Sequence, residues 1–282
     1  MKKRIIIFGA GFISNSLLEK LKINNFQDVI QINKKKIDLF QNSSIKKIKK
    51  LLKNNDIIIF IAARAPVKNI SMLEYNIKIL HNFIEAIENK KIHHFIYVSS
   101  DAVYDDSKKF ITEKSNINPK SFHGLMHYYR ERILSNYLNC PLCIVRPTLV
   151  YGEKDPHNGY GPNQFIRSAQ NKKNIKIFGN GEELRDHVCI DTVSDAIYEL
   201  IKKRYNGAIN IVSGRAYSFK DIANRVIKNY KQIKLIKIAR KGPMPHDGLR
   251  KFDDKLLKNI IRKHKIVNLL DWIDKKKKYR IK

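Results

Sequence analysis

Five short apolar segments, separated by segments of helical periodicity, constrain the fold of this chain more than any other feature. They span residues 4–8, 29–32, 56–63, 94–100 and 142–150. Strands that are continuously apolar, rather than alternating, are buried on both faces, and intervening helices supply the crossovers that parallel strands need. The pattern therefore predicts an α/β fold with a doubly wound parallel sheet.

The segments between these strands carry apolar residues at helical spacing. The predicted helices are one through Leu17, Leu18 and Leu21, which follows a glycine turn, and others at 45–52, 76–87 and 127–138.

The pattern changes after Val150. Residues 151–163 are polar and rich in Gly and Pro, and a strand-loop-helix unit follows at 176–200. A strand at 207–214 and a helix with Ser218 as its N-cap come next. We expect a Rossmann domain of residues 1–155 plus 181–204, and a small C-terminal α/β lid of residues 156–180 and 205–282.

The net charge of +30 is compatible with two hypotheses, a nucleic-acid binder or a biased solvated surface. Most basic residues are lysines scattered among Ile and Asn, and Arg-rich or Gly-aromatic nucleic-acid motifs are absent. The pattern favours a lysine-rich surface without a specific nucleic-acid partner. The charge should still attract anionic ligands.

Neither a membrane span nor a metal site is expected. No apolar run approaches the roughly 20 residues that cross a bilayer, and the run after the basic N-terminus leads directly into a glycine turn. We expect a cytoplasmic protein. Cys140 and Cys143 form a C-x-x-C, but no second ligand pair follows at zinc spacing, so core thiols are favoured and no metal is expected.

A glycine turn follows the first strand and opens a helix. Gly9 permits the tight turn, and Gly11 allows a pyrophosphate to approach the backbone at a helix N-terminus. Ser14 replaces the third glycine of the dinucleotide fingerprint and is small enough for close helix packing. The position predicts a nicotinamide dinucleotide site, with Phe12 and Ile13 in the first helical turn.

The residues after the second strand bear on the choice of coenzyme. Asn33 is followed by Lys34, Lys35 and Lys36, where an acidic residue usually binds the ribose hydroxyls of NAD. Cations suit a 2′-phosphate, although these lysines also fit the general lysine bias. NAD or NADP is expected, and the lysines favour NADP.

Several motifs taken together are similar to one enzyme family. They are VSSDAVY (98–104), PKSFHGLMHYYRE (119–131), RPTLVYG (146–152), GPN (161–163), FGNG (178–181) and Arg185-Asp186. This combination resembles the extended short-chain dehydrogenases of the NAD-dependent epimerase/dehydratase type, which act on nucleotide sugars. The resemblance covers nearly the whole chain and implies a substrate-binding role for the C-terminal lid.

The resemblance also implies a departure at the catalytic pair. In the family a tyrosine exchanges the proton of a sugar hydroxyl, and a lysine four residues later binds the nicotinamide ribose and lowers the pKa of the tyrosine. Here these positions hold His123 and His127. A histidine titrates near neutrality, so His123 can perform acid–base work without a lysine. His127 can donate a hydrogen bond to a ribose hydroxyl.

The remaining catalytic candidates follow from the same resemblance. Ser100 is expected to bind the reacting oxygen, and Asp101 is a candidate proton donor. The partner that removes a ring proton in dehydratases is missing, which counts against dehydration. Tyr128 and Arg132 share the i, i+4 spacing, but the fixed register of the surrounding motif argues against them.

The family's other binding positions map onto residues across the chain. Those implied for the coenzyme are Gly9, Gly11, Phe12, Ile13, Asn33, Lys34, Asp38, Leu39, Ala62, Ala63, Asn76 and His127. Those implied for the substrate are Ser100, Asn163, Arg185 and Arg250. A planar guanidinium such as that of Arg185 suits a diphosphate.

The predicted function is NAD(P)-dependent epimerisation or keto-reduction of a nucleotide-diphosphate sugar, in the synthesis of polysaccharide or glycan precursors. A homodimer is expected. The main alternative is a non-catalytic relative that retains coenzyme or sugar-nucleotide binding. A nucleic-acid-binding Rossmann protein is the third hypothesis.

Overall fold

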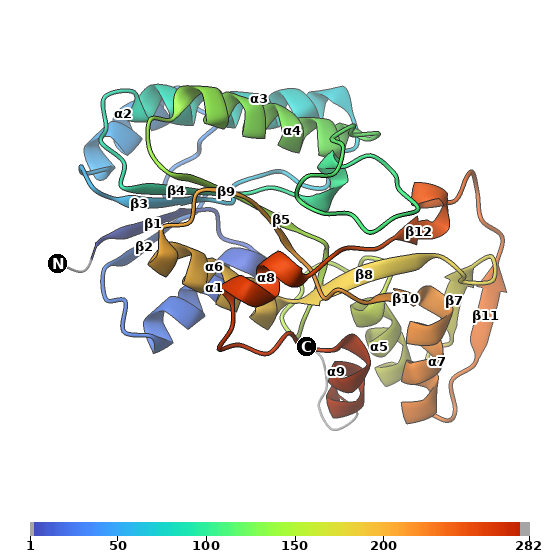
Figure 1. Cartoon of the computed structure of the whole chain (residues 1–282). Helices are drawn as coiled ribbons and strands as arrows, with labels where there is room; N and C mark the ends of the chain where they lie inside the picture. The colour runs from blue at the N-terminus through green and yellow to red at the C-terminus, as the bar shows by residue number, and fades with distance from the viewer. Residues whose placement is uncertain (1–2, 277–282) are drawn as a thin grey trace. The chain divides into compact units, whose positions relative to one another are not determined.

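The computed structural model describes residues 3–276 and contains a six-stranded sheet flanked by helices (Figure 1). The strand order is β2 (Val29–Ile32), β1 (Ile5–Phe8), β3 (Ile57–Phe60), β4 (His94–Val98), β5 (Leu142–Pro147) and β9 (Gly207–Ile211). The pairings among β2, β1, β3, β4 and β5 are all parallel. The predicted doubly wound α/β fold is confirmed.

Helices cover both faces of this sheet. One face carries α2 (Ser43–Leu51), α3 (Ile70–Ile87) and α4 (Phe122–Tyr137), and the other carries α1 (Phe12–Ile23) and α6 (Ile190–Lys203) (Figure 1). Each residue of β1 is fully buried, because helices cover both sides of the strand. Phe8 and Phe60 both pack against Phe83 of α3, with ring centroids 4.8 and 4.7 Å apart.

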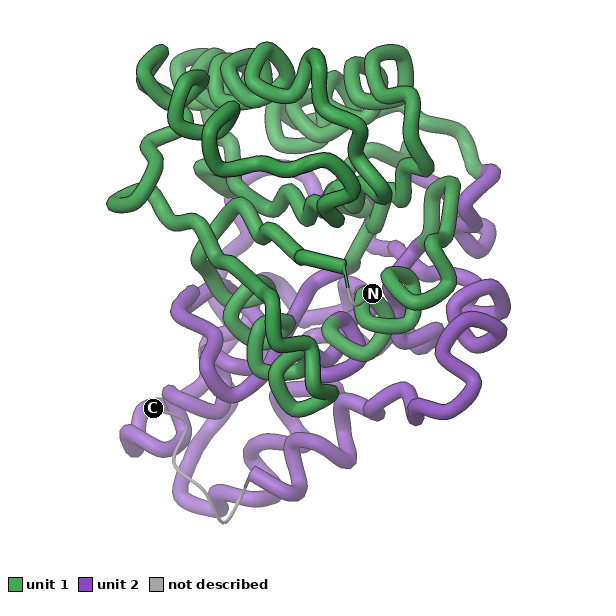
Figure 2. The backbone as a smooth tube through the Cα atoms, turned by 90° about the vertical axis from the view of Figure 1, so that its left-hand side faces the viewer, with its two compact units in different colours: residues 1–105, 115–147, 194–209 green, residues 106–114, 148–193, 210–282 purple. Residues whose placement is uncertain are grey.

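The described chain divides into two compact units (Figure 2). Unit 1 comprises residues 1–105, 115–147 and 194–209, and unit 2 comprises residues 106–114, 148–193 and 210–282. Relative to the expected boundaries, residues 106–114, 148–155 and 181–193 group with unit 2, and 205–209 group with unit 1. The roles expected for the two domains remain predictions.

Unit 2 is built on a small mixed sheet. Strand β8 (Leu184–Cys189) pairs with β6 (Leu149–Tyr151), β10 (Ala216–Ser218) and β12 (Leu249–Arg250). A second, two-stranded sheet joins β7 (Ile175–Phe178) and β11 (Leu235–Ile238) in parallel. The helices of this unit are α5 (Pro162–Gln170), α7 (Phe219–Asn229), α8 (Lys255–Ile260) and α9 (Leu269–Lys275). Ser218 caps α7 as predicted, and its hydroxyl accepts a hydrogen bond from Asp221 N at 3.0 Å.

The single strand predicted at 142–150 is wrong, because the structure divides it between two sheets. Strand β5 ends at Pro147, whose ring removes the backbone donor that a continued ladder needs. Thr148 N still donates to Ile211 O of β9, the neighbour of β5, and the chain then enters β6, which pairs with β8. An apolar run does not reveal which sheet each residue joins.

Two helices begin earlier than predicted. Helix α3 begins at Ile70, where the Asn69 side chain accepts a hydrogen bond from Met72 N. Helix α4 begins at Phe122, after Ser121 accepts a hydrogen bond from Gly124 N. Capping side chains set both starts, whereas apolar periodicity becomes visible only further along each helix.

Candidate active site

The glycine turn lies where the strand order reverses. Strand β2 lies on one side of β1, and the next strand in sequence, β3, lies on the other side. This reversal of strand order forms a ligand crevice at the carboxyl ends of the strands. Gly9 has a φ of +129°, and a Cβ there would lie 3.1 Å from Ala62 N. Only glycine fits this turn without displacing the residues that follow β3.

Gly11 leaves open space at the start of α1. It is the N-cap of α1, and a Cβ placed on it would meet no protein atom within 4 Å. Ser14 is buried and its hydroxyl accepts a hydrogen bond from Gly11 N at 2.7 Å. The space before this helix N-terminus is therefore open, with Phe12 and Ile13 half-buried in the first turn, which fits a bound pyrophosphate.

The residues after β2 form a compact polar turn. Asn33 Oδ1 accepts a hydrogen bond from Lys36 N at 2.9 Å, and Asp38 Oδ1 accepts one from Phe40 N. The exposed Lys34 Nζ lies 3.7 Å from Asp38 Oδ2, so a carboxylate of this protein already faces that cation. Leu39 is buried, and its carbonyl accepts a hydrogen bond from Asn82 of α3.

The segment after β3 is tied to α3 and α4 by buried polar contacts. Asn76 is fully buried, and its amide bonds to both Arg64 N and Arg64 O, at 2.9 and 3.0 Å. Arg130 of α4 donates to Ala62 O at 2.9 Å and to Asn76 O at 2.6 Å. Asn76 and Arg130 thus hold the backbone that follows β3 against α3 and α4. Arg130 was not among the residues predicted from the sequence.

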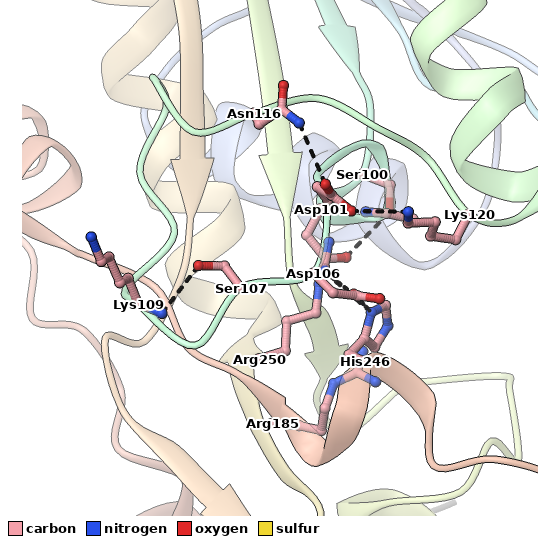
Figure 3. A network of polar contacts seen from close by, with 12 residues as sticks. Ser100, Asp101, Asp106, Ser107, Lys109, Asn116, Lys120, Arg185, His246 and Arg250 are labelled. Carbon is pink, nitrogen blue, oxygen red and sulfur yellow. Dashed lines mark hydrogen bonds and ion pairs between the residues drawn. The ribbon is translucent and has the colours of Figure 1, made fainter.

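A close helix contact brings the candidate catalytic residues together in unit 1. Ser100 caps a short 3-10 turn at Asp101–Val103, and its hydroxyl lies 3.4 Å from Asp101 Oδ1 (Figure 3). A Cβ on Gly124 of α4 would lie 2.1 Å from Ala102 O. Gly124 therefore allows the start of α4 to lie directly against this turn, which places His123 beside Asp101.

The half-buried His123 and the buried His127 form a pair on α4. Their ring centroids are 4.7 Å apart and the planes are nearly perpendicular. Burial lowers the pKa of His123, and Asp101 opposes that shift while Arg130 adds to it. Burial lowers the pKa of His127 well below its ordinary value, and the charges of His123 and Arg130 lower it further. Both rings are therefore neutral near pH 7.

Sequence reasoning also missed the ion pair beneath this site. Arg146 of β5 donates through Nε and Nη2 to the two carboxylate oxygens of Glu131, at 2.9 and 2.6 Å. Ser99 donates to the same carboxylate at 2.5 Å, and Arg146 Nη1 donates to the Tyr104 hydroxyl at 2.8 Å. All four side chains are buried, so this pair fixes α4 against β4 and β5. Their sequence separation left no local pattern to predict it.

Of the predicted substrate residues, Ser100 lies in unit 1, and Asn163, Arg185 and Arg250 lie in unit 2. Asn163 is buried at the start of α5, where its Oδ1 accepts a hydrogen bond from Gly152 N at 3.3 Å. Arg185 on β8 lies 3.1 Å from Glu183 Oε1. Arg240, which sequence reasoning missed, lies 3.5 Å from the other oxygen of Glu183. Two guanidinium groups therefore share one carboxylate.

Arg250 of β12 is the register partner of Arg185 on β8, and its side chain belongs to a second ion-pair cluster of unit 2. Its side chain is 1% exposed, and Nη1 lies 3.1 Å from Asp106 Oδ1 (Figure 3). His246 Nδ1 contacts the same oxygen at 2.6 Å. Arg250 thus takes part in an ion-pair network of the protein, and the Asn163 side chain bonds to the backbone. The binding of substrate by these two residues stays a prediction.

No helix within residues 3–276 is long and apolar enough to cross a membrane. The same residues contain no group of three or more His, Cys, Asp or Glu side chains arranged to bind a metal. Cys140 and Cys143 are free thiols, half-buried and buried, and burial raises the pKa of both.

A doubly wound sheet with a glycine turn at its switch point defines a dinucleotide-binding Rossmann protein. The chain belongs to the NAD dependent epimerase/dehydratase family, whose model matches residues 5–212. The resemblance seen in the sequence motifs is confirmed at the level of the family.

Two curated relatives show how far sequence similarity extends. The chain is 30% identical over 193 residues to a dTDP-D-glucose 4,6-dehydratase of Dictyostelium discoideum, a match that covers 61% of this chain but only 44% of that protein. It is 29% identical over 245 residues to a putative UDP-glucose 4-epimerase of Methanocaldococcus jannaschii, covering 77% and 79% of the two chains.

Solved structures share the fold over nearly the whole chain. UDP-glucuronic acid 4-epimerase from Bacillus cereus, in complex with UDP-glucuronic acid and NAD, superposes with a TM-score of 0.82 at 19% identity and 98% coverage of both chains. UDP-glucose 4-epimerase from Thermotoga maritima, with UDP-glucose, gives a TM-score of 0.82 at 20% identity, covering 95% and 96%. At these identities the likeness establishes the fold.

Proposed function

We propose that this protein is an NAD-dependent enzyme that epimerises or reduces a nucleotide-diphosphate sugar at a ring hydroxyl, in the synthesis of polysaccharide or glycan precursors. The observation that carries the proposal is the cluster of Ser100, Asp101, His123 and His127 in the same unit as the open glycine turn. The family assignment supports it, and the UDP-sugar epimerases that share the fold favour a UDP-sugar.

For the coenzyme we propose NAD. The family description and the epimerase complexes that contain NAD support this choice. The sequence favoured NADP because of the lysines after β2, but the contact between Lys34 and Asp38 leaves a carboxylate near the position where NAD enzymes place one. Fluorescence titration with NADH and NADPH tests this point, and tighter binding of NADPH would restore the sequence-based preference.

The proposed chemistry assigns the proton to His123. Bound NAD would supply the hydride acceptor and donor for the sugar carbon. Ser100 would hold the reacting oxygen, and neutral His123 would accept the hydroxyl proton and return it to the same oxygen. The lowered pKa of His123 keeps a basic nitrogen available at neutral pH. Asp101 would then stabilise the imidazolium that forms, since its negative charge opposes the lowering of the His123 pKa by burial.

The proposed binding of the diphosphate rests on unit 2. Arg185 and Arg240 share Glu183, so the three groups carry one excess positive charge. Arg240 Nη2 is buried without a hydrogen-bond partner in the described chain, which leaves a donor for an anionic ligand. We propose that these two arginines bind phosphate oxygens, with Asn163 and Arg250 contributing to the same substrate.

A panel of UDP-, GDP-, CDP- and dTDP-sugars, each with NAD or NADP and followed by NMR and mass spectrometry, tests the proposal. We expect an epimer or a reduced sugar from at least one of them, with a UDP-sugar the best substrate. NAD binding without conversion of any sugar would favour the non-catalytic alternative. Sedimentation of the same sample would test the expected homodimer.

A further inference from the structure

Tyr97 makes a buried hydrogen bond to the histidine that replaces the family's lysine. Its hydroxyl lies 2.7 Å from His127 Nδ1. Tyr97 comes from the middle of β4 and is fully buried, whereas His127 on α4 retains 5% of its exposure. Burial raises the pKa of Tyr97, so the hydroxyl keeps its hydrogen throughout the neutral range.

The direction of this hydrogen bond follows from the burial of the Tyr97 hydroxyl. Within residues 3–276, His127 Nδ1 is its one hydrogen-bond partner. If the hydroxyl accepted a hydrogen from Nδ1, its own hydrogen would be buried without an acceptor, which is costly. The hydroxyl therefore donates to His127 Nδ1, and Nδ1 is the unprotonated nitrogen of a neutral ring.

We propose that Tyr97 is a positioning residue that fixes His127 in the tautomer with its hydrogen on Nε2. His127 then presents an N–H donor at the position from which the family's lysine donates to the nicotinamide ribose, while Arg130 supplies a buried positive charge. The role toward ribose rests on the proposed function. The tautomer itself is a property of the free protein.

The electrostatic surroundings keep this arrangement stable at neutral pH. The ionisable groups that act on the pair are His123 and Arg130 of α4, Glu131 of the same helix, and Tyr97 of β4. Burial is the largest cause of the lowered pKa of His127, and the charge of Arg130, together with that of His123 when it is protonated, acts in the same direction. The neutral ring is therefore favoured over the imidazolium.

Long-range ¹H–¹⁵N NMR of the full chain measures the tautomer without substrate or coenzyme. The His127 signals are assigned by their loss in His127→Gln. We expect a protonated Nε2 and a bare Nδ1 in the wild type, and a mixture of tautomers in Tyr97→Phe. The same substitution should weaken NAD binding by about two- to tenfold, the effect of one neutral hydrogen bond.

Tyr129→Phe is the matched control, because Tyr129 on α4 bonds to His81 Nε2 at 2.6 Å. It should move the His81 signals and leave the His127 tautomer and NAD affinity unchanged. A hydrogen on Nδ1 of His127 in the wild type, or an unchanged pattern in Tyr97→Phe, would overturn the positioning role. The expected tautomer in a protein that binds no NAD would overturn the proposed function and the ribose-directed role together.

Discussion

The two units differ in how their charged side chains are paired. In unit 1, Glu131 is matched to one arginine and one serine in a buried network, and the two histidines nearby are neutral. In unit 2, Arg185 and Arg240 share the single carboxylate of Glu183. Unit 1 is therefore suited to holding and moving a proton, and unit 2 to binding an anion.

The net charge of +30 therefore does not predict the chemistry of either unit. Lysines make up most of the basic residues, whereas the site in unit 1 depends on two neutral histidine rings and on buried charges, such as Glu131 and Arg146, that are paired with each other. If the comparison is right, changes in unit 1 should affect turnover or stability, and changes in unit 2 should affect substrate affinity.

The largest effect is expected from His123→Gln. Removing a positioned general base lowers kcat by about 10²- to 10⁴-fold, while NAD binding should stay within about twofold because Gly9 and Gly11 are untouched. Wild-type kcat should rise with pH through the lowered pKa of His123, below 6.5, and then level off. Steady-state kinetics from pH 5 to 8 measure both. Unchanged turnover in His123→Gln would assign the proton to Asp101, Tyr104 or Tyr128.

The next largest effect is expected from Arg146→Met, and it should appear in the free energy of unfolding. It leaves Glu131 buried and charged without its bidentate partner, which costs about 3–5 kcal/mol. The matched control is Lys258→Ala in unit 2, whose side chain is 62% exposed with its Nζ 2.8 Å from Asp254 Oδ2, and which should cost under about 1 kcal/mol. Urea unfolding compares the two. Equal losses would show that burial does not distinguish these ion pairs.

The buried carboxylate of Asp186 in unit 2 should make the free energy of unfolding depend on pH. Burial raises its pKa from the ordinary 3.8 to about 6, although Ser213 N and Thr148 Oγ1 donate to it. The folded protein therefore binds more protons between these values, and stability should fall by up to about 3 kcal/mol as pH rises from about 4 to 6. Asp186→Asn should remove this dependence while the same curve for wild type retains it. Parallel curves would exclude Asp186 as its source.

Arg185→Gln should have the smallest effect. Losing a charge-assisted hydrogen bond to phosphate should raise KM for the nucleotide sugar by about 10- to 100-fold with kcat nearly unchanged. Arg215→Gln removes the same charge from an exposed position of unit 2 and should leave KM within about twofold. An equal rise in both variants would mean that general charge, rather than the arrangement around Glu183, attracts the substrate.

The sequence predicted the parallel sheet well because continuous burial requires continuous apolar strands. It failed at residues 142–150, where Pro147 and Thr148 pass the chain from one sheet to another and hydrophobicity does not change. Helix starts at Ile70 and Phe122 were missed because caps, rather than apolar spacing, set them.

For the site, the motifs located Gly9, Gly11, Ser100, Asp101, His123 and His127, all in unit 1. They did not reveal Tyr97, Arg130 or the Glu131–Arg146 pair, because these contacts join different elements whose residues are 15 to 54 positions apart in sequence. Spacing rules describe neighbours within one element, while contacts between elements depend on packing.

The most direct test of the account is the absorbance of reduced nicotinamide when a UDP-sugar is added to the NAD-loaded protein. We expect a reduced signal with the wild type and none with His123→Gln, whose NAD content is unchanged. Reduction at the wild-type rate in His123→Gln, or no reduction in the wild type with any sugar that binds, would contradict it.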